Sequence, residues 1–337
     1  MSTTSTLPQP SKSPRPAASA APIADERTGT HVRLDVDLDT VLQKLRKVEK
    51  NAEKRKQYLD SLKGLPKKER KLKRFTADTA DRHELYQLSV QSPEEDAQFL
   101  HKVYKKSRGK VGTHFREDFS GTCILSKNWI TRGKEYTAEG FDIDPDPIAW
   151  GLYHNFRKLG ASAERMLIHQ KDVREPSTQA PDIRCAQNFS YWIFKTREEM
   201  LGYFKTVLED LADDGVFVVD LHGGPESIEE LEEEREIDEG FTYVWDQDGF
   251  APISGDLDCR IHFRFEDGTE MKNAFRYTWR MWFLTELRDV LTDAGFQSVD
   301  CYWEGTDEDG ESGNGVFKKE KKGENCLSYI AYLVALK

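Results

Sequence analysis

HFREDFSGTCILSKNWI, residues 114–130, reads as a strand, a tight turn around Gly121 and a helix. The turn is built of small residues, and Glu117 lies at the end of the strand. A turn without bulky side chains lets backbone N–H groups and the helix N-terminus approach a polar ligand closely. The stretch therefore predicts a junction of the kind that binds nucleotide-like cofactors. The alternative is an ordinary βα turn, since many of these contain glycine.

A series of further strands is predicted after this junction. The run TAEGFD ends at Asp142, and Pro145 and Pro147 stand where a following helix begins. Asp142 lies 25 residues after Glu117, close to the spacing of about 20 at which an acid reaches ribose hydroxyls in dinucleotide-binding folds. The other apolar runs are RMLIHQ before Asp172, PDIRCAQ before Asn188 and GVFVVDL at 215–221.

This ordered series of strand ends resembles class I S-adenosylmethionine-dependent methyltransferases. EDFSGTC is similar to a degenerate form of their Gly-rich turn, with Phe119 and Cys123 in place of two glycines. The resemblance covers about Tyr86 to Lys337. It implies a doubly wound α/β fold with a seven-stranded, mostly parallel sheet and a terminal antiparallel hairpin, and S-adenosylmethionine as cofactor.

The resemblance also implies residue roles. Asp142 would hold the ribose, Asp172 the adenine amino group with Val173 beside the ring, and Asn188 would lie near the methyl donor. The candidate cofactor-binding residues are Tyr86, Glu117, Phe119, Gly121, Thr122, Asp142, Ile143, Asp172, Val173 and Asn188.

The candidate catalytic residues are Asn188 and Tyr191. NFSY faintly resembles the Asn-x-x-Tyr of amino-methylating enzymes, but Phe189 and Ser190 replace its two prolines. Ordinary core packing is the alternative for Tyr191. Asp220 and His222 are further candidates for relaying a proton.

The chain divides by composition into three parts. Residues 1–30 are rich in Ser, Thr, Pro and Ala and predict a disordered tail. Residues 31–80 predict a basic, partly helical arm, and residues 81–337 the class I methyltransferase domain. Alternating apolar residues within about 241–283 predict an antiparallel β-flap in that domain. The acidic run at 226–239 is expected as an exposed helix, and the Gly-rich stretch 313–326 as a loop.

The arm has a strongly positive local charge. Residues 41–74 hold 14 Lys or Arg and 4 Asp or Glu, about +10, whereas the formal net charge of the chain is −11. A solvated helical arm is one interpretation. A nucleic-acid contact is the other, because such a run can neutralise several phosphates.

Two kinds of acceptor are open for the methyl group. Arginines in the flap could bind an anionic acceptor, and the acidic run could attract a cationic one. The flap arginines are Arg260, Arg264, Arg276 and Arg280. The expected function is methyl transfer to a small amine or carboxylate. The alternatives are an RNA or protein methyltransferase that docks through the arm, and a non-catalytic cofactor-binding or scaffold protein.

Composition predicts a cytoplasmic protein. No apolar run approaches the roughly 20 residues of a membrane helix, and no signal peptide is recognisable. The five cysteines are far apart and odd in number, which favours a reducing compartment over a disulfide framework. The histidines are dispersed, so no metal site is predicted.

Overall fold

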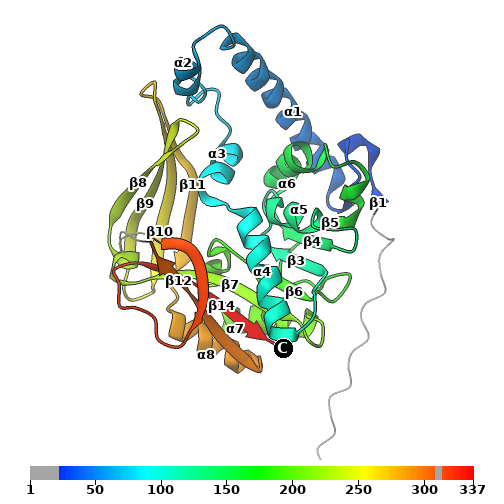
Figure 1. Ribbon diagram of the computed structural model, residues 1–337, viewed down its shortest axis with the longest axis vertical. Helices are drawn as coiled ribbons and strands as arrows, with labels where there is room; N and C mark the ends of the chain where they lie inside the picture. Colours follow the sequence, from blue (N-terminus) through cyan, green and yellow to red (C-terminus); the bar gives the residue numbers. More distant parts are fainter. Residues whose placement is uncertain (1–22, 308–312) are drawn as a thin grey trace, which may run out of the picture.

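The computed structural model describes residues 23–307 and 313–337 and has a central sheet with strand order β1-β2-β5-β4-β3-β6-β7-β14-β12-β13 (Figure 1). Strands β3 to β7 run parallel, and β14 and β12 add to them antiparallel. The expected doubly wound α/β fold with a terminal antiparallel pair is therefore confirmed. The seven strands are β3 (His114–Asp118), β4 (Thr137–Asp142), β5 (Met166–Gln170), β6 (Ile183–Ala186), β7 (Val216–Gly223), β12 (Ser298–Thr306) and β14 (Tyr329–Leu336).

Three more strands extend the sheet at its edges. β1 (Ile23–Ala24) pairs with β2 (Arg33–Asp35), and β2 lies parallel to β5. Of the disordered tail expected for residues 1–30, residues 1–22 lie outside the described part, whereas the residues that follow them reach the sheet. At the other edge, β13 (Gly313–Glu320) is a strand where a loop was expected. It pairs with β12, and the ring centroids of Phe317 and Tyr332 lie 4.6 Å apart.

Helices cover both faces of the central sheet. The alternation of side chains along β7 explains this, since Val216 and Val218 enter one core cluster while Phe217 and Val219 enter the other. The first cluster packs against α1 (Leu38–Ser61), α4 (Pro93–Arg108), α5 (Ile124–Ile130) and α6 (Pro145–Gly151). The second packs against α7 (Arg197–Asp210) and α8 (Leu284–Ala294).

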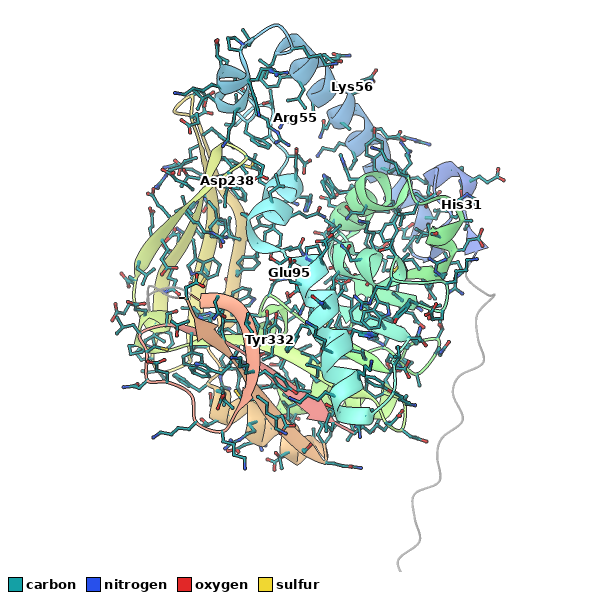
Figure 2. The ribbon with its side chains drawn as sticks, in the orientation of Figure 1. His31, Arg55, Lys56, Glu95, Asp238 and Tyr332 are labelled. Carbon is teal, nitrogen blue, oxygen red and sulfur yellow. The ribbon has the colours of Figure 1, made fainter. Side chains whose placement is uncertain are left out.

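The basic arm is anchored in the fold at its first half. Val41, Leu42 and Leu45 of α1 are buried in the first core cluster. The second half of α1 reaches α2 (Lys67–Leu72), and Arg55 there lies 4.6 Å from the ring centroid of Phe75 (Figure 2). The chain then enters α3 (Arg82–Val90). Val41, Leu42 and Leu45 therefore belong to the core in spite of the positive charge around them.

The flap is an antiparallel sheet of four strands, as Figure 1 shows beside the central sheet. Its order is β11 (Glu270–Arg280), β10 (Asp256–Phe265), β9 (Phe241–Ala251) and β8 (Leu231–Ile237). The helix expected for the acidic run is wrong, because Leu231–Ile237, which contain most of its glutamates, form the strand β8. Pairing with β9 along the whole strand outweighs the helix propensity of its glutamates. No helix within the described ranges is both long and apolar enough to span a membrane.

Candidate functional site

The turn after β3 has an unusual backbone. Phe119, Gly121 and Cys123 all have positive φ, at 55°, 50° and 55°. Glycine adopts this region freely, whereas Phe and Cys do so at a cost of roughly 1 kcal/mol or more. The two residues that replace glycines therefore keep the backbone path that a glycine-rich turn would take. Serine and threonine lie between them, and α5 begins directly after Cys123.

Asp142, at the end of β4, is tied to this turn. Its Oδ2 accepts a hydrogen bond of 2.7 Å from the backbone N–H of Gly121, and Oδ1 accepts one of 2.9 Å from that of Asp144. Burial raises the pKa of this carboxyl, and these backbone hydrogen bonds oppose the rise. The expected ribose-binding acid is thus held at the edge of the turn, and the next side chain, Ile143, is 70% exposed.

Glu117 and Thr122 fix the turn through hydrogen bonds to neighbouring residues. Glu117 is buried, and its Oε2 accepts hydrogen bonds from the backbone N–H of Ser126 at 2.9 Å and from its hydroxyl at 2.5 Å. Burial raises the pKa of Glu117 to about 7. Gln87 of α3 donates a 2.7 Å hydrogen bond to the hydroxyl of Thr122. Glu117 therefore holds the first turn of α5, and α3 contacts the turn through Gln87 and Thr122.

The end of β5 carries the residues expected at an adenine ring. Asp172 accepts two hydrogen bonds from the Arg174 guanidinium, at 2.9 and 2.6 Å, and this partner lowers its pKa. The carbonyl of Val173 accepts 2.6 Å hydrogen bonds from the guanidinium groups of both Arg116 and Arg184. Buried arginines therefore hold the backbone at this position, whereas Asp172 is partly exposed and already engaged.

Asp220 of β7 clamps the turn after β6. Asn188 and Phe189 both have positive φ, at 55° and 56°, and their backbone N–H groups donate to the two oxygens of Asp220 at 2.7 and 3.1 Å. Burial raises the pKa of Asp220 to about 7, and the two backbone hydrogen bonds oppose the rise. Asn188 consequently lies at the carboxyl ends of the central strands, where ligands bind in open α/β sheets.

Tyr191 is buried in the core. Its side chain is 0% exposed, belongs to the second core cluster, and donates a 2.7 Å hydrogen bond to the backbone carbonyl of Asp220. The structure therefore favours ordinary core packing, the alternative stated for Tyr191. Tyr191 lies in the 3-10 helix Ser190–Ile193, and this helix turns its ring into the core.

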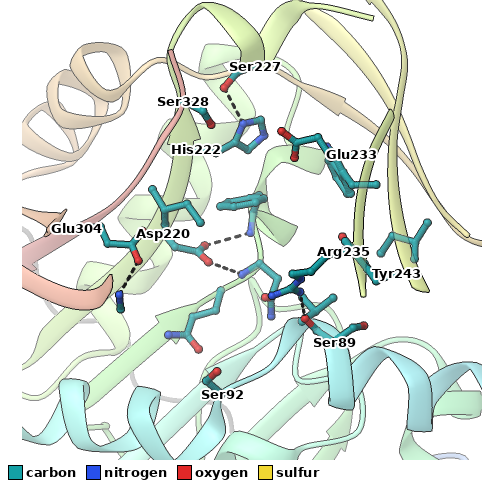
Figure 3. A pocket seen from close by; sticks show the side chains of 18 of the residues that line it. Ser89, Ser92, Asp220, His222, Ser227, Glu233, Arg235, Tyr243, Glu304 and Ser328 are labelled. Atoms are coloured by element: carbon teal, nitrogen blue, oxygen red, sulfur yellow. Dashed lines mark hydrogen bonds between the residues drawn. The ribbon is translucent and has the colours of Figure 1, made fainter. Parts of the chain in front are cut away.

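A cavity of about 960 Å³ lies between the central sheet, the start of α4 and the flap (Figure 3). Among the expected residues, Tyr86 and Asn188 line it, together with Asp220 and His222. Glu117, Gly121, Asp142 and Asp172 do not. The structure therefore separates the candidate residues into two groups, one around the turn after β3 and one around the cavity, with Asn188 at the end of the neighbouring strand β6.

The flap arginines are not part of the cavity lining. Arg260 pairs with Asp248, Arg264 with Glu232, Glu234 and Glu270, and Arg280 with Glu286. Arg276 is exposed and does not line the cavity either. The anion-binding interpretation of these arginines is therefore wrong for this cavity, because their charges are neutralised along the flap or face solvent.

Sequence reasoning missed the flap residues that do line the cavity. Trp245, Tyr277 and Trp279 face it from β9 and β11, and Glu233 and Arg235 from β8. The alternation of side chains in the flap was a usable signal for Tyr277 and Trp279. For Glu233 and Arg235 the signal was hidden, since the acidic run was expected to be a helix. Within the described ranges, no cluster of His, Cys, Asp or Glu is suited to a metal ion.

No protein-family profile and no curated protein sequence matches the chain. Solved structures do match. An S-adenosylmethionine-dependent methyltransferase from Clostridium acetobutylicum is 14% identical, with 75% of this chain and 97% of that chain covered and a TM-score of 0.56. The chain has the class I methyltransferase fold.

Two further structures with the methyltransferase fold are similar to the chain. An amino pentose methyltransferase from Micromonospora echinaspora, solved with S-adenosylmethionine bound, is 17% identical over 75% of this chain and 95% of that chain, with a TM-score of 0.55. A sugar N-methyltransferase from Streptoalloteichus is 15% identical over 77% and 93%, with a TM-score of 0.52. Identities this low concern the fold alone.

Proposed function

We propose that the chain is an S-adenosylmethionine-dependent methyltransferase that acts on a small molecule. The observation that carries the proposal is the turn after β3, where three alternate residues keep positive φ and Asp142 binds the N–H of Gly121. Two of the three residues are not glycine, so the fold retains this backbone path at a cost in strain. Retention of a strained path at a candidate site favours a functional reason over an accidental turn.

The residues around the turn fit the parts of the cofactor. Asp142 would accept hydrogen bonds from the ribose hydroxyls, because each carboxylate oxygen has a second lone pair besides the one used here. The exposed Ile143 offers apolar surface to an adenine ring that would lie beside Val173, and Asp172 offers a hydrogen-bond acceptor to its amino group. When bound, the cofactor would supply an electrophilic methyl group on sulfonium.

The cavity supports a small acceptor. It is bounded by Asn188 on the central sheet and by the flap, which would shield a reacting pair from water. Most of the rate of such a transfer can come from holding donor and acceptor in line, so a dedicated nucleophilic residue is not required. The RNA or protein alternative lacks comparable support, since the first half of the arm packs into the core rather than presenting a free docking surface.

The test is calorimetric titration with S-adenosylhomocysteine. We expect micromolar binding to the wild type and a loss of at least about 30-fold in Asp142→Ala, because two charge-assisted hydrogen bonds are removed. Asp144→Ala is the matched control, since that carboxylate caps α6 through the N–H of Asp146 and should leave affinity nearly unchanged. Absence of binding to folded wild type would instead support the non-catalytic scaffold alternative.

A further inference from the structure

The cavity holds carboxylates that have no cationic partner. Glu95, Glu226 and Glu233 line it, and none of the three carboxylates has a hydrogen-bond or ion-pair partner among the described residues. Asp96 and Asp220 line it as well, and burial raises their pKa to about 6 and about 7. These carboxylates carry negative charge without a cationic partner, so a cation entering this space would be stabilised.

Positive charge in the cavity lining is scarce. Arg235 is the single Lys or Arg among the lining residues that the structure describes. Its guanidinium donates to the backbone carbonyl of Ser89 and lies over the ring of Tyr243, 5.4 Å from the centroid. Figure 3 shows Arg235 turned toward Ser89. Glu233 lies on β8, the same strand as Arg235. One arginine therefore does not offset the carboxylates of the cavity.

An aromatic wall faces the carboxylates. The rings of Tyr277 and Trp279 are stacked with centroids 4.4 Å apart, and Trp245 lies 6.4 and 6.3 Å from them. All three residues line the cavity. The faces of such rings attract cations, most strongly where water is excluded. An apolar neutral ligand would use the aromatic wall but not the carboxylates, whereas an organic cation would use both.

His222 provides a second, independent indication of a ligand. Its side chain is 9% exposed, Nδ1 lies 2.9 Å from the hydroxyl of Ser227, and Nε2 has no partner (Figure 3). Buried polar atoms are normally paired, so this nitrogen fits a position that a ligand fills. Burial lowers the pKa of His222 to about 4, and no charged group contributes to the shift. The imidazole is therefore neutral and does not repel a cation.

We propose that the cavity binds a small organic cation whose charge is a primary or secondary ammonium group. Such a group donates to the carboxylates and to His222, while its carbon skeleton lies on the aromatic wall. The inference rests on the proposed function in one respect, namely that the bound amine is the methyl acceptor. Its nitrogen, after giving one proton to water, can form the new N–C bond as the methyl–sulfur bond breaks and the electron pair stays on sulfur.

The test compares three probes of one shape by ligand-observed NMR titration of the full chain at pH 7.5. Cyclohexylamine is cationic, cyclohexanol neutral and cyclohexanecarboxylate anionic. We expect cyclohexylamine to bind at least about tenfold more tightly than either of the others, as one or two desolvated charge contacts would produce. Equal binding of the three, tighter binding of the carboxylate, or binding of none of them to the folded protein would overturn the proposal.

Two variants on one strand separate the cavity from general surface charge. Glu233→Gln should weaken cyclohexylamine binding roughly two- to five-fold, since a partly exposed carboxylate is removed. Glu236→Gln makes the same charge change at a residue of β8 that does not line the cavity, and it should have no effect. Equal effects of the two variants would show non-specific attraction and refute the cavity site.

Asp142→Ala distinguishes this inference from the proposed function. That residue lies at the turn after β3 and outside the cavity lining, so the variant should lose S-adenosylhomocysteine and keep cyclohexylamine. If the wild type binds cyclohexylamine but not S-adenosylhomocysteine, the cation site stands and the proposed function fails. If it binds S-adenosylhomocysteine but shows no preference for cyclohexylamine, the proposed function stands and the cation site fails.

Discussion

Asp142 accepts a 2.7 Å hydrogen bond from the backbone N–H of Gly121, 21 residues earlier in the chain. The bond joins the ends of two neighbouring parallel strands, β3 and β4, which the sheet places side by side. It fixes the Asp142 carboxylate beside Gly121 and restrains the backbone of the turn. The same contact therefore links the fold to the candidate cofactor site.

Close packing of α6 on this turn predicts a large effect of a small substitution. A Cβ on Gly151 would lie 2.3 Å from the backbone oxygen of Thr122, which cannot move without displacing the turn. We expect Gly151→Ala to lower the free energy of unfolding by roughly 1–3 kcal/mol, as overpacking does. Gly202→Ala in α7 is the control, because its Cβ would meet nothing within 4 Å, and it should be neutral or stabilising. Urea denaturation checks both, and equal stability of the two variants would contradict the packing argument.

The buried charge cluster beneath the Val173 loop predicts another stability effect. Arg184 is 0% exposed and donates to Asp118, Asp210 and the carbonyl of Val173. Arg184→Leu would leave buried carboxylates short of a partner, and we expect a loss of roughly 3–5 kcal/mol in the free energy of unfolding.

Arg174→Leu is the matched comparison for that variant. It breaks the exposed pair with Asp172 and should cost less than about 1 kcal/mol. Chemical denaturation measures both variants. Similar costs for the two would mean that the buried cluster contributes no more than a surface pair.

Glu117 predicts how stability depends on pH. Its pKa is about 7 in the folded protein against an ordinary value of 4.5, because burial disfavours the charged form. Between these values the native state binds more protons than the unfolded state, so stability falls as pH rises, by up to about 1.4 kcal/mol per pH unit from this group. Glu117→Gln keeps an oxygen for Ser126 but removes the titration. The fall in stability between pH 5 and 7 should be shallower in the variant, and an unchanged slope would refute the assignment.

Charge substitutions in α2 test the nucleic-acid alternative without unfolding the arm. Truncation would remove Val41, Leu42 and Leu45 from the core, whereas the described side chains of α2 are not buried. Changing Lys67, Lys68 and Lys71 to Gln should leave methyl transfer to a small acceptor unchanged. If RNA is the acceptor, the same variant should make the negative slope of log affinity against log salt shallower. The expected change is about 0.7 for each phosphate that the protein no longer neutralises.

Exposed lysines on another helix provide the control for this experiment. Lys102, Lys105 and Lys106 of α4 give the same change in charge at a different place when replaced by Gln. Filter binding at several salt concentrations measures all three proteins. Loss of RNA binding confined to the α2 variant would favour the docking alternative, and equal effects would assign the binding to net charge.

The regular part of the fold could be predicted because its signals are local. Apolar runs ending in Asp142, Asp172 and Asn188 mark parallel strands, and Thr196 with Glu199 forms the capping box that opens α7. β8 and β13 could not be predicted in this way, since their residues favour a helix or a loop in isolation. Both are strands because a neighbouring strand supplies the hydrogen bonds.

The sequence by itself determined the order of strands and the positions of their polar ends, because alternation and strand-to-turn boundaries depend on neighbouring residues only. Tertiary structure alone decided which candidates face a ligand. It buried Tyr191 against the carbonyl of Asp220, neutralised most of the flap arginines with acids of the flap and α8, and brought Glu233 and His222 into one cavity. The physical reason is that burial and charge pairing depend on contacts between residues far apart in the chain.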